Sequence, residues 1–462
     1  MKTLYINKLR STFFCLSLFS VIFISCEDFL EEDNPVGLNS SKLTDLAAMT
    51  ALNYGAFDDL RNFYAYQPMI TSGFVRDWIV RRDGNWFPYF EWTNTGVPEM
   101  FSGNTYNQGY QVLNKVHTVL ESDIEGMYGS ELDKNGIEGD SHFLRAAVYF
   151  QMNNFYTLPS TGNSVPLTLK TIGPNDKIGV STSAEIKAQI ESDIEQARTL
   201  LSSSSNSIIS HTAATAMAAR IYFFHEKYDL AYERANEVIL TGEYSLEENV
   251  ADIYTNGGSS KEAIYTIVNN LTENGFGAKT EGFSLFQADK TNGTLSLNPN
   301  GLIGQLMNAD PNDERFSTLF TDNSTVDGDG LIYVDGKYPS TGVDNIILRL
   351  PEIYLTRAES NIMSNNSVSS QDVEDVNTIK NRSGASDTVT GIPNASDMLE
   401  IIFDERSKEL CFEWGDRFLN TRRLQKSIIN EEGNGFIGFS NYNNLLVYPF
   451  NANEIRIHNL QR

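Results

Sequence analysis

The feature that most constrains this chain is residues 211–244, which read as two short helices joined by a turn. The first helical pattern carries small residues with larger apolar ones beside them: Ala214, Ala218, Ala219, Ile221 and Tyr222. The second carries Tyr228, Ala231, Ala235 and Val238, whose spacing of three or four places them on one helix face. Since small residues let two helix axes approach closely, we expect a hairpin that turns at residues 226–228.

The same hairpin carries the spacing of a known repeat. Ala219, Tyr222 and Ala231 fall at spacings similar to the small, aromatic and small positions of a tetratricopeptide repeat of roughly 34 residues. One such helix pair cannot bury its apolar face alone, so neighbouring helices must stack on it. An ordinary helical hairpin in an all-α protein is the alternative that this stretch leaves open.

Helical periodicity predicts further helices on both sides of the hairpin. They cover residues 44–63, 107–124, 140–156, 182–201, 350–363, 370–382 and 397–412. The helical pattern stops after residue 63, where an aromatic-rich segment follows. Residues 245–351 are rich in glycine and asparagine, with short β-rich runs at 263–268 and 331–334. We therefore expect an all-α dominated fold of tetratricopeptide-like helix pairs with a loop-rich, minor-β insert.

The first 25 residues have the pattern of a secretory signal peptide. Basic residues precede an apolar run at 11–24, which is shorter than the roughly 20 residues that cross a bilayer. The run ends at Ile24-Ser25-Cys26, and a small residue directly before a cysteine resembles a bacterial lipobox. That resemblance implies cleavage before Cys26 and lipidation of its thiol. Plain cleavage by signal peptidase, with Cys26 as an incidental thiol, is the alternative.

The charge balance restricts the binding partners of the chain. Its formal net charge is −25, and removal of the basic signal peptide makes it more negative, which argues against binding to nucleic acid or to anionic lipid. An acidic tether at 27–33 follows Cys26 and is similar to the surface-export signal of Bacteroidetes-type lipoproteins. Only Cys411 remains as a thiol beyond Cys26, so disulfides do not hold the fold.

Six blocks in order resemble the SusD/RagB family of outer-membrane nutrient-binding lipoproteins. They are the lipobox with its acidic tether, Gly139–Phe150, the hairpin at 212–241, Arg349–Glu359, Val376–Gly384, and Ile402–Leu410 running on to Arg422-Arg423. The tail from Tyr448 to Asn459 also looks like the family's closing segment, with Phe450-Asn451 where Ile-Pro is common.

The resemblance implies four tetratricopeptide-like helix pairs with a loop-rich insert beside them. It also implies a protein without enzymatic activity that lies on a SusC-like TonB-dependent transporter and delivers glycans, or sometimes peptides, into it. We predict a signal peptide at 1–25, an N-terminal SusD-like helical region at 26–241, a loop-rich insert at 242–345 and a C-terminal RagB/SusD region at 346–462. The expected location is the outer membrane, lipid-anchored and facing the exterior.

The aromatic-rich segment at 74–98 is the predicted ligand-binding region. Sugars carry apolar faces and rings of hydroxyls, so they are held by aromatic platforms beside hydrogen-bonding groups. The predicted platforms are Trp78, Trp86, Tyr89 and Trp92, and their predicted polar partners are Arg81, Asp83 and Asn85. Phe283, in a second segment at 274–286, is a further candidate. The alternative is that these aromatics pack the body or contact the transporter.

Enzymatic motifs are weak or missing in the sequence. Glu405, Glu409 and Glu413 stand four residues apart, which suggests either the carboxylates of a secreted glycoside hydrolase or ion pairs to nearby arginines. We favour ion pairs that tie the last helix to its neighbours. The motifs HExxH, GxSxG, CxxC and an intact P-loop are not found, so no cofactor or metal is predicted. Residues 327–330 are read as a turn, with calcium binding as the alternative.

Overall fold

The computed structural model describes residues 44–80, 87–93, 102–173, 176–202, 207–269, 295–322, 331–340, 343–450 and 455. Helices dominate this part of the chain, and its strands form only two-stranded antiparallel sheets. The all-α dominated fold with a minor-β component is therefore confirmed. Among the described residues, no helix is both long and apolar enough to cross a membrane.

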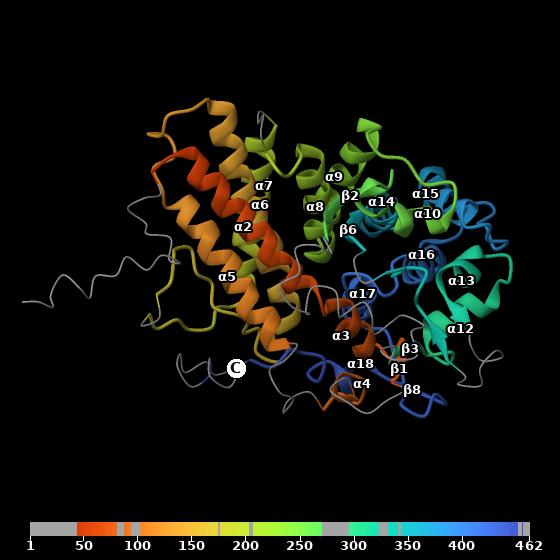
Figure 1. The fold of residues 1–462 in the computed structure, drawn as a ribbon. Helices are drawn as coiled ribbons and strands as arrows, with labels where there is room; N and C mark the ends of the chain where they lie inside the picture. Colours follow the sequence, from red (N-terminus) through yellow and green to blue (C-terminus); the bar gives the residue numbers. More distant parts are fainter. Residues whose placement is uncertain are drawn as a thin grey trace, which may run out of the picture.

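Helix pairs form the body of the molecule (Figure 1). Each helix in the series packs on the next, and the series is α2 (Leu46–Tyr64), α5 (Ser102–Leu120), α6 (Glu131–Tyr156), α7 (Ser183–Leu201), α8 (His211–Phe224), α9 (Tyr228–Thr241), α14 (Leu350–Asn365) and α15 (Ser370–Arg382). Taken two at a time, these helices are the four pairs that the family resemblance implies. The fourth pair, α14 with α15, joins the stack from the far end of the chain.

The hairpin at 211–244 lies in the centre of this stack. Every residue from Thr212 to Phe224 is buried, and α9 ends at Gly242, whose left-handed φ of 65° suits glycine. The turn falls between Phe224 and Tyr228, as predicted. Arg220 is the one arginine of α8, and its guanidinium pairs with Glu352 of α14 at 2.5 Å. This buried ion pair ties the third helix pair to the fourth.

Short elements occupy the region between α9 and α14 and the segments beside α3 (Gln67–Phe74). The helices are α4 (Phe87–Phe90), α10 (Val250–Asn256), η3 (Gly257–Ser259), α12 (Leu302–Ala309) and α13 (Glu314–Leu319). The sheets pair β1 (Trp78–Val80) with β3 (Leu295–Leu297), β2 (Ala263–Ile267) with β6 (Asn345–Arg349), β4 (Thr321–Asp322) with β5 (Ile332–Tyr333), and β7 (Ile428–Ile429) with β8 (Phe436–Ile437). The C-terminal region adds α16 (Ala395–Glu409), α17 (Asp416–Arg423) and α18 (Phe439–Tyr442).

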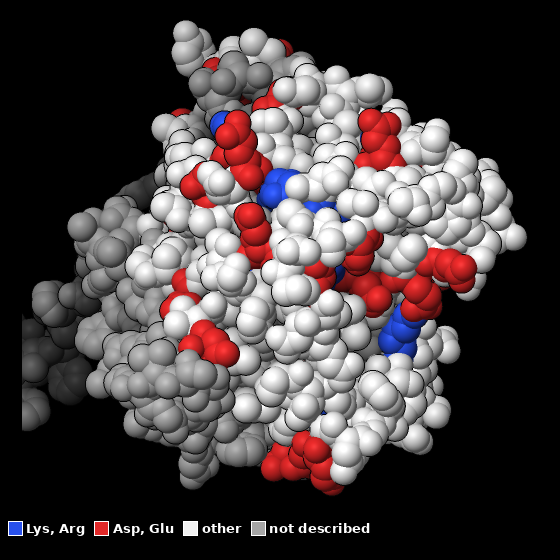
Figure 2. All heavy atoms as spheres, turned by 90° about the vertical axis from the view of Figure 1, so that its right-hand side faces the viewer, with Lys and Arg blue, Asp and Glu red and all other residues white. Residues whose placement is uncertain are grey.

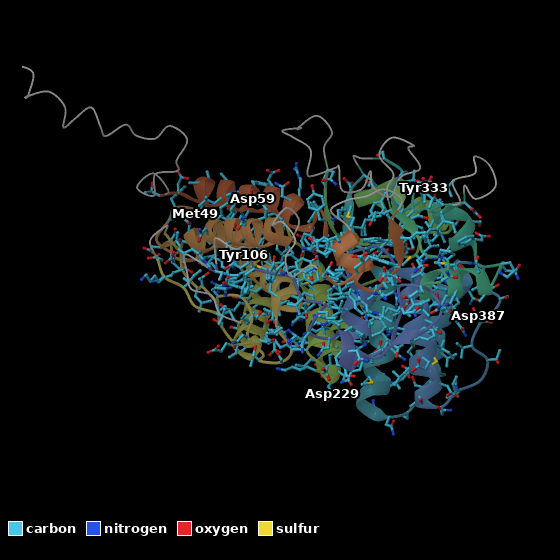
Figure 3. All side chains as sticks on the ribbon, turned by 90° about the horizontal axis from the view of Figure 1, so that it is seen from below. Met49, Asp59, Tyr106, Asp229, Tyr333 and Asp387 are labelled. Carbon is cyan, nitrogen blue, oxygen red and sulfur yellow. The ribbon has the colours of Figure 1, made fainter. Side chains whose placement is uncertain are left out.

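One large apolar core runs through the helix stack and reaches the short sheets. A smaller core fills the space between α14, α15 and α16. Met49 of α2 and Tyr333 of β5 lie at opposite sides of the molecule, with the packed side chains between them (Figure 3).

The sequence prediction was wrong about the end of the helical pattern at residue 63. Helix α3 follows at Gln67–Phe74, with Pro68 in its first turn, where proline's missing N–H costs nothing. All eight of its residues are buried, so the helix has no solvent-exposed face. A helix buried all round shows no amphipathic period, which is why periodicity did not reveal it. The domain boundaries at 26–241, 242–345 and 346–462 stay a prediction.

Candidate ligand-binding surface

Trp78 is a core residue and not a ligand platform. Its side chain is 0% exposed, and its indole Nε1 donates a hydrogen bond to the Met69 carbonyl at 2.6 Å. The ring stacks on Phe90 with centroids 6.0 Å apart. It also lies so close to Gly73 that a Cβ there would approach the ring to 2.3 Å. The prediction for Trp78 was therefore wrong, because both its apolar ring and its one donor are satisfied inside the protein.

Tyr89 and Trp92 also point into the protein. Tyr89 is 0% exposed and meets Phe74 edge to face. Trp92 is buried, and its Nε1 donates to the Phe74 carbonyl at 3.0 Å. The Arg76 guanidinium lies 4.0 Å from the centre of the Trp92 ring. Neither ring is open to a ligand, so these two predictions were also wrong.

Charged residues at the start of the same segment fasten it to the C-terminal region. Asp77 is buried and accepts two hydrogen bonds from Arg417 Nε of α17, each 2.9 Å long. Burial raises the pKa of Asp77 to about 6, against the lowering effect of Arg417. Arg76 donates to the Ile429 carbonyl at 2.9 Å and to the Phe90 carbonyl at 3.1 Å. These residues position α3 and β1 and were not identified as structural from the sequence.

The remaining predicted site residues lie outside the described residues. They are Arg81, Asp83, Asn85, Trp86 and Phe283, together with the predicted lipidation site Cys26.

The described residues that flank these segments come together at one small sheet. The antiparallel register pairs Val80, just before 81–86, with Leu295, just after 270–294. A third segment, 323–330, is followed by Leu331 and Ile332. The amide of Ile332 donates at 2.8 Å to the hydroxyl of Ser296, the residue after Leu295. The described ends of three segments therefore lie close together, although the segments are far apart in sequence.

A polar cavity of about 260 Å³ lies on another part of the described surface. It is formed where the C-terminal end of α6, the first turns of α7, the α8–α9 turn, α17 and α18 meet. Asn153 of α6 donates to the Ser183 hydroxyl of α7 at 3.0 Å. Arg422 of α17 donates to the Asn154 carbonyl at 2.8 Å. The sequence analysis missed this cavity, because its walls come from segments as distant as 153 and 443.

The three carboxylates that suggested hydrolysis are buried in ion pairs. Glu405 is 0% exposed, Glu409 2% and Glu413 8%. Glu405 pairs with Arg315 at 2.7 Å, and Glu413 pairs with Lys337 at 2.7 Å. Glu409 contacts three guanidiniums, those of Arg315, Arg349 and Arg382.

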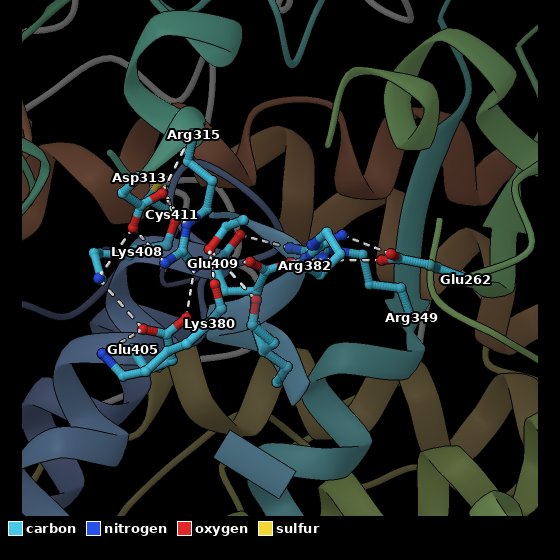
Figure 4. Close-up of polar contacts among 12 residues, drawn as sticks. Glu262, Asp313, Arg315, Arg349, Lys380, Arg382, Glu405, Lys408, Glu409 and Cys411 are labelled. Atoms are coloured by element: carbon cyan, nitrogen blue, oxygen red, sulfur yellow. Dashed lines mark hydrogen bonds and ion pairs between the residues drawn. The ribbon is translucent and has the colours of Figure 1, made fainter. Parts of the chain in front are cut away.

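These contacts belong to a buried ionic cluster that extends to Glu262 and Asp313 (Figure 4). It links α13, β6 and α15 to α16, so the predicted ion pairing of the last helix is confirmed. All three carboxylates are buried and paired with cationic side chains, whereas hydrolysis needs two carboxyls that flank a bound sugar. The arrangement therefore gives no support to hydrolysis at this row.

Comparison with known families identifies the class of protein to which this stack of helix pairs belongs. A model described as "Starch-binding associating with outer membrane" matches residues 28–223, and a model described as "SusD family" matches residues 310–453. The two matches follow one another along the chain and are consistent with the observed helical fold. The chain belongs to the SusD/RagB family.

Solved structures share this fold over most of their length. A SusD superfamily protein from Bacteroides thetaiotaomicron VPI-5482 is 23% identical, with a TM-score of 0.78 and coverage of 90% of this chain and 99% of that one. One from Bacteroides vulgatus ATCC 8482 is 20% identical, with a TM-score of 0.75 and coverage of 90% and 98%. A laminarin-binding SusD-like protein is 17% identical, with a TM-score of 0.68 and coverage of 83% and 92%. Among curated proteins, no match is found.

Proposed function

We propose that this protein is a surface lipoprotein that binds glycan and delivers it to a SusC-like TonB-dependent transporter in the outer membrane. The observation that carries the proposal is the ordered pair of family matches on a chain that folds as four helix pairs. The laminarin-binding protein of the same fold adds support for a carbohydrate ligand. The buried carboxylate row argues for binding without turnover.

A glycan panel tests this function directly. We expect the purified protein to bind at least one oligo- or polysaccharide saturably, to leave it chemically unchanged, and to co-purify with a barrel transporter. Saturable binding to a peptide panel, with no binding to glycans, would mean that the natural ligand is a peptide. Release of shorter sugars from an oligosaccharide on long incubation would instead make the protein a hydrolase.

Membrane attachment through Cys26 gives a first prediction. Cys26→Ala is expected to move the protein from the membrane fraction to the soluble fraction, because its net charge of −25 offers no electrostatic hold on anionic lipid. Cell fractionation followed by a high-salt wash measures this. Cys15→Ala, in the predicted signal peptide, is the matched control and should leave the mature protein attached. Retention of the Cys26 variant after the wash would contradict lipid anchoring.

We propose that the glycan site lies where the segments around Trp86 and Phe283 meet the β1–β3 sheet. Support comes from the register of Val80 with Leu295, which brings the described ends of the two segments together. Arg81, Asp83 and Asn85 are the proposed hydrogen-bonding partners. Trp78, Tyr89 and Trp92 are buried, so the proposed platform is Trp86, which lies outside the described residues.

Replacement of Trp86 gives a second prediction. Trp86→Ala is expected to weaken glycan binding by about tenfold or more, since an aromatic platform contributes apolar contact and specific geometry. The melting temperature should change little. Isothermal titration and thermal unfolding on the same samples measure both effects. Tyr128→Ala, at a fully exposed tyrosine, is the control for a surface aromatic. A large drop in melting temperature would place Trp86 in the core and remove it from the site.

A further inference from the structure

The polar cavity between α6, α7, α17 and α18 has an unusual charge. Its lining includes three basic side chains. Arg423 pairs with Glu359, whereas Lys187 and Arg422 have no carboxylate partner among the described residues. The chain as a whole has 60 acidic and 35 basic residues, and acidic side chains are scattered over the face seen in Figure 2. In such a protein, most basic groups that approach the interior find a carboxylate. No carboxylate of the described residues neutralises these two basic groups, so an anion bound in the cavity would offset their charge.

Arg422 stands out from its neighbours on α17. Arg417 pairs with Asp77 at 2.9 Å, and Arg423 pairs with Glu359. Arg422 instead donates one hydrogen bond to the Asn154 carbonyl, while its Nε is buried without an acceptor. Burial lowers the pKa of Arg422 to about 10, because no carboxylate among the described residues offsets the loss of water. An unmatched buried donor on a cationic side chain is costly unless something binds it.

The remaining lining suits a sugar ring. Asn153, Ser183 and Asn443 provide amide and hydroxyl groups that can both donate and accept hydrogen bonds. Phe439 is half-buried and provides an apolar face at the cavity wall. The volume of about 260 Å³ lies just below the range of drug-sized ligand pockets, which begins near about 300 Å³, so the cavity fits one ring better than a longer chain.

We propose that this cavity binds a sugar ring carrying one oxyanion, a carboxylate or a sulfate ester, with the oxyanion between Lys187 and Arg422. The proposal rests on the proposed glycan-binding function and specifies an acidic sugar as the ligand of this cavity. Charge-assisted hydrogen bonds from both basic groups would hold the oxyanion. Glu226 is the acidic member of the lining and sits on the exposed α8–α9 turn, where it opposes binding of an anion.

The test uses three matched monosaccharides and the purified full-length lipoprotein in neutral detergent, without phosphate or sulfate in the buffer. Glucuronate and glucose 6-sulfate are the anionic probes, and glucose is the neutral one. Ligand-observed nuclear magnetic resonance should show saturable binding of at least one anionic sugar, at least tenfold tighter than glucose. The affinity should fall as salt is raised. The sugar that binds distinguishes a carboxylate from a sulfate ligand.

Charge substitutions localise the binding. Lys187→Gln is expected to weaken it about tenfold, and Arg422→Gln at least as much, whereas Glu226→Gln should strengthen it several-fold. Lys187 has no hydrogen-bond or ion-pair partner among the described residues, so its substitution should leave the melting temperature unchanged. Lys227→Gln is the matched control, because that nearby lysine already pairs with Glu191 at 2.5 Å. It should leave the affinity unchanged.

The possible failures are distinguishable. If neutral glycans bind but neither anionic sugar does, this inference is wrong and the proposed function stands. If no glycan binds at all, both are wrong. Anionic binding that survives Lys187→Gln and Arg422→Gln, or that weakens in Glu226→Gln, would place the sugar elsewhere and overturn the assignment of this cavity.

Discussion

Glu409→Gln is expected to lower the free energy of unfolding by about 3–5 kcal/mol, the usual cost of breaking a buried ion pair from one side. Glu409 is 2% exposed and contacts Arg315, Arg349 and Arg382. The substitution keeps the side chain's size and removes its charge, so three buried guanidiniums share one carboxylate fewer. Urea unfolding followed by circular dichroism measures the change.

The same cluster predicts the acid sensitivity of the fold. Burial alone raises the pKa of Glu409, but Arg382, Arg349 and Arg315 outweigh it, and the pKa stands well below its ordinary value of 4.5. Because the folded pKa is the lower one, the ionised carboxylate stabilises the protein above pH 4.5. That contribution is lost as the pH falls through the folded pKa. The stability difference between wild type and Glu409→Gln should therefore be full at neutral pH and shrink in acid.

A surface ion pair provides the control. Glu400 is 62% exposed and pairs with Lys426, so Glu400→Gln should cost under about 1 kcal/mol. If Glu409→Gln cost no more than this control, the buried cluster would contribute little to stability. If the stability difference between wild type and Glu409→Gln grew as the pH fell, the pKa of Glu409 would not be lowered in the folded protein.

Trp78→Ala is expected to lower the free energy of unfolding by about 3–5 kcal/mol, the range for removal of a large buried aromatic. The substitution empties the space against Gly73 and Phe90 and removes the hydrogen bond to the Met69 carbonyl. Trp78 also pairs with Leu297 across the β1–β3 sheet, beside which the glycan site is proposed. The substitution should therefore disturb that site as well. Chemical unfolding monitored by circular dichroism measures the effect.

A second substitution separates packing from ligand contact at this position. Trp78→Phe keeps an aromatic ring in the core, so it should cost less stability than alanine and preserve glycan binding. Loss of binding in Trp78→Phe with unchanged stability would mean that the indole touches ligand, contrary to its 0% exposure.

The helix stack was predictable because its signals are local. Ala214, Ala218 and Tyr222 repeat at helical spacing, and the turn at Glu226 separates two periodic segments. Such patterns report on the residues next to them in the chain, and the structure confirms them.

The orientation of the aromatics was not predictable in the same way. Trp78 and Trp92 look like surface platforms when they stand among Arg76 and Asp77 in sequence. The structure shows that Arg76 covers Trp92 and that Asp77 pairs with Arg417, 340 residues away. Polar neighbours in sequence therefore did not imply exposure, because their partners come from the C-terminal region. The cavity around Lys187 and Arg422 was missed for the same reason.

The fourth helix pair has a consequence for the order in which the protein is assembled. Helix α9 packs on α14, so the apolar side of the third pair stays uncovered until a segment more than a hundred residues later has been added to the chain. Contacts of such high sequence separation form slowly, since the chain must first close a long loop. A chain truncated before residue 350 would expose the end of an unfinished stack to water. The chain is therefore most prone to aggregate before α14 packs on α9.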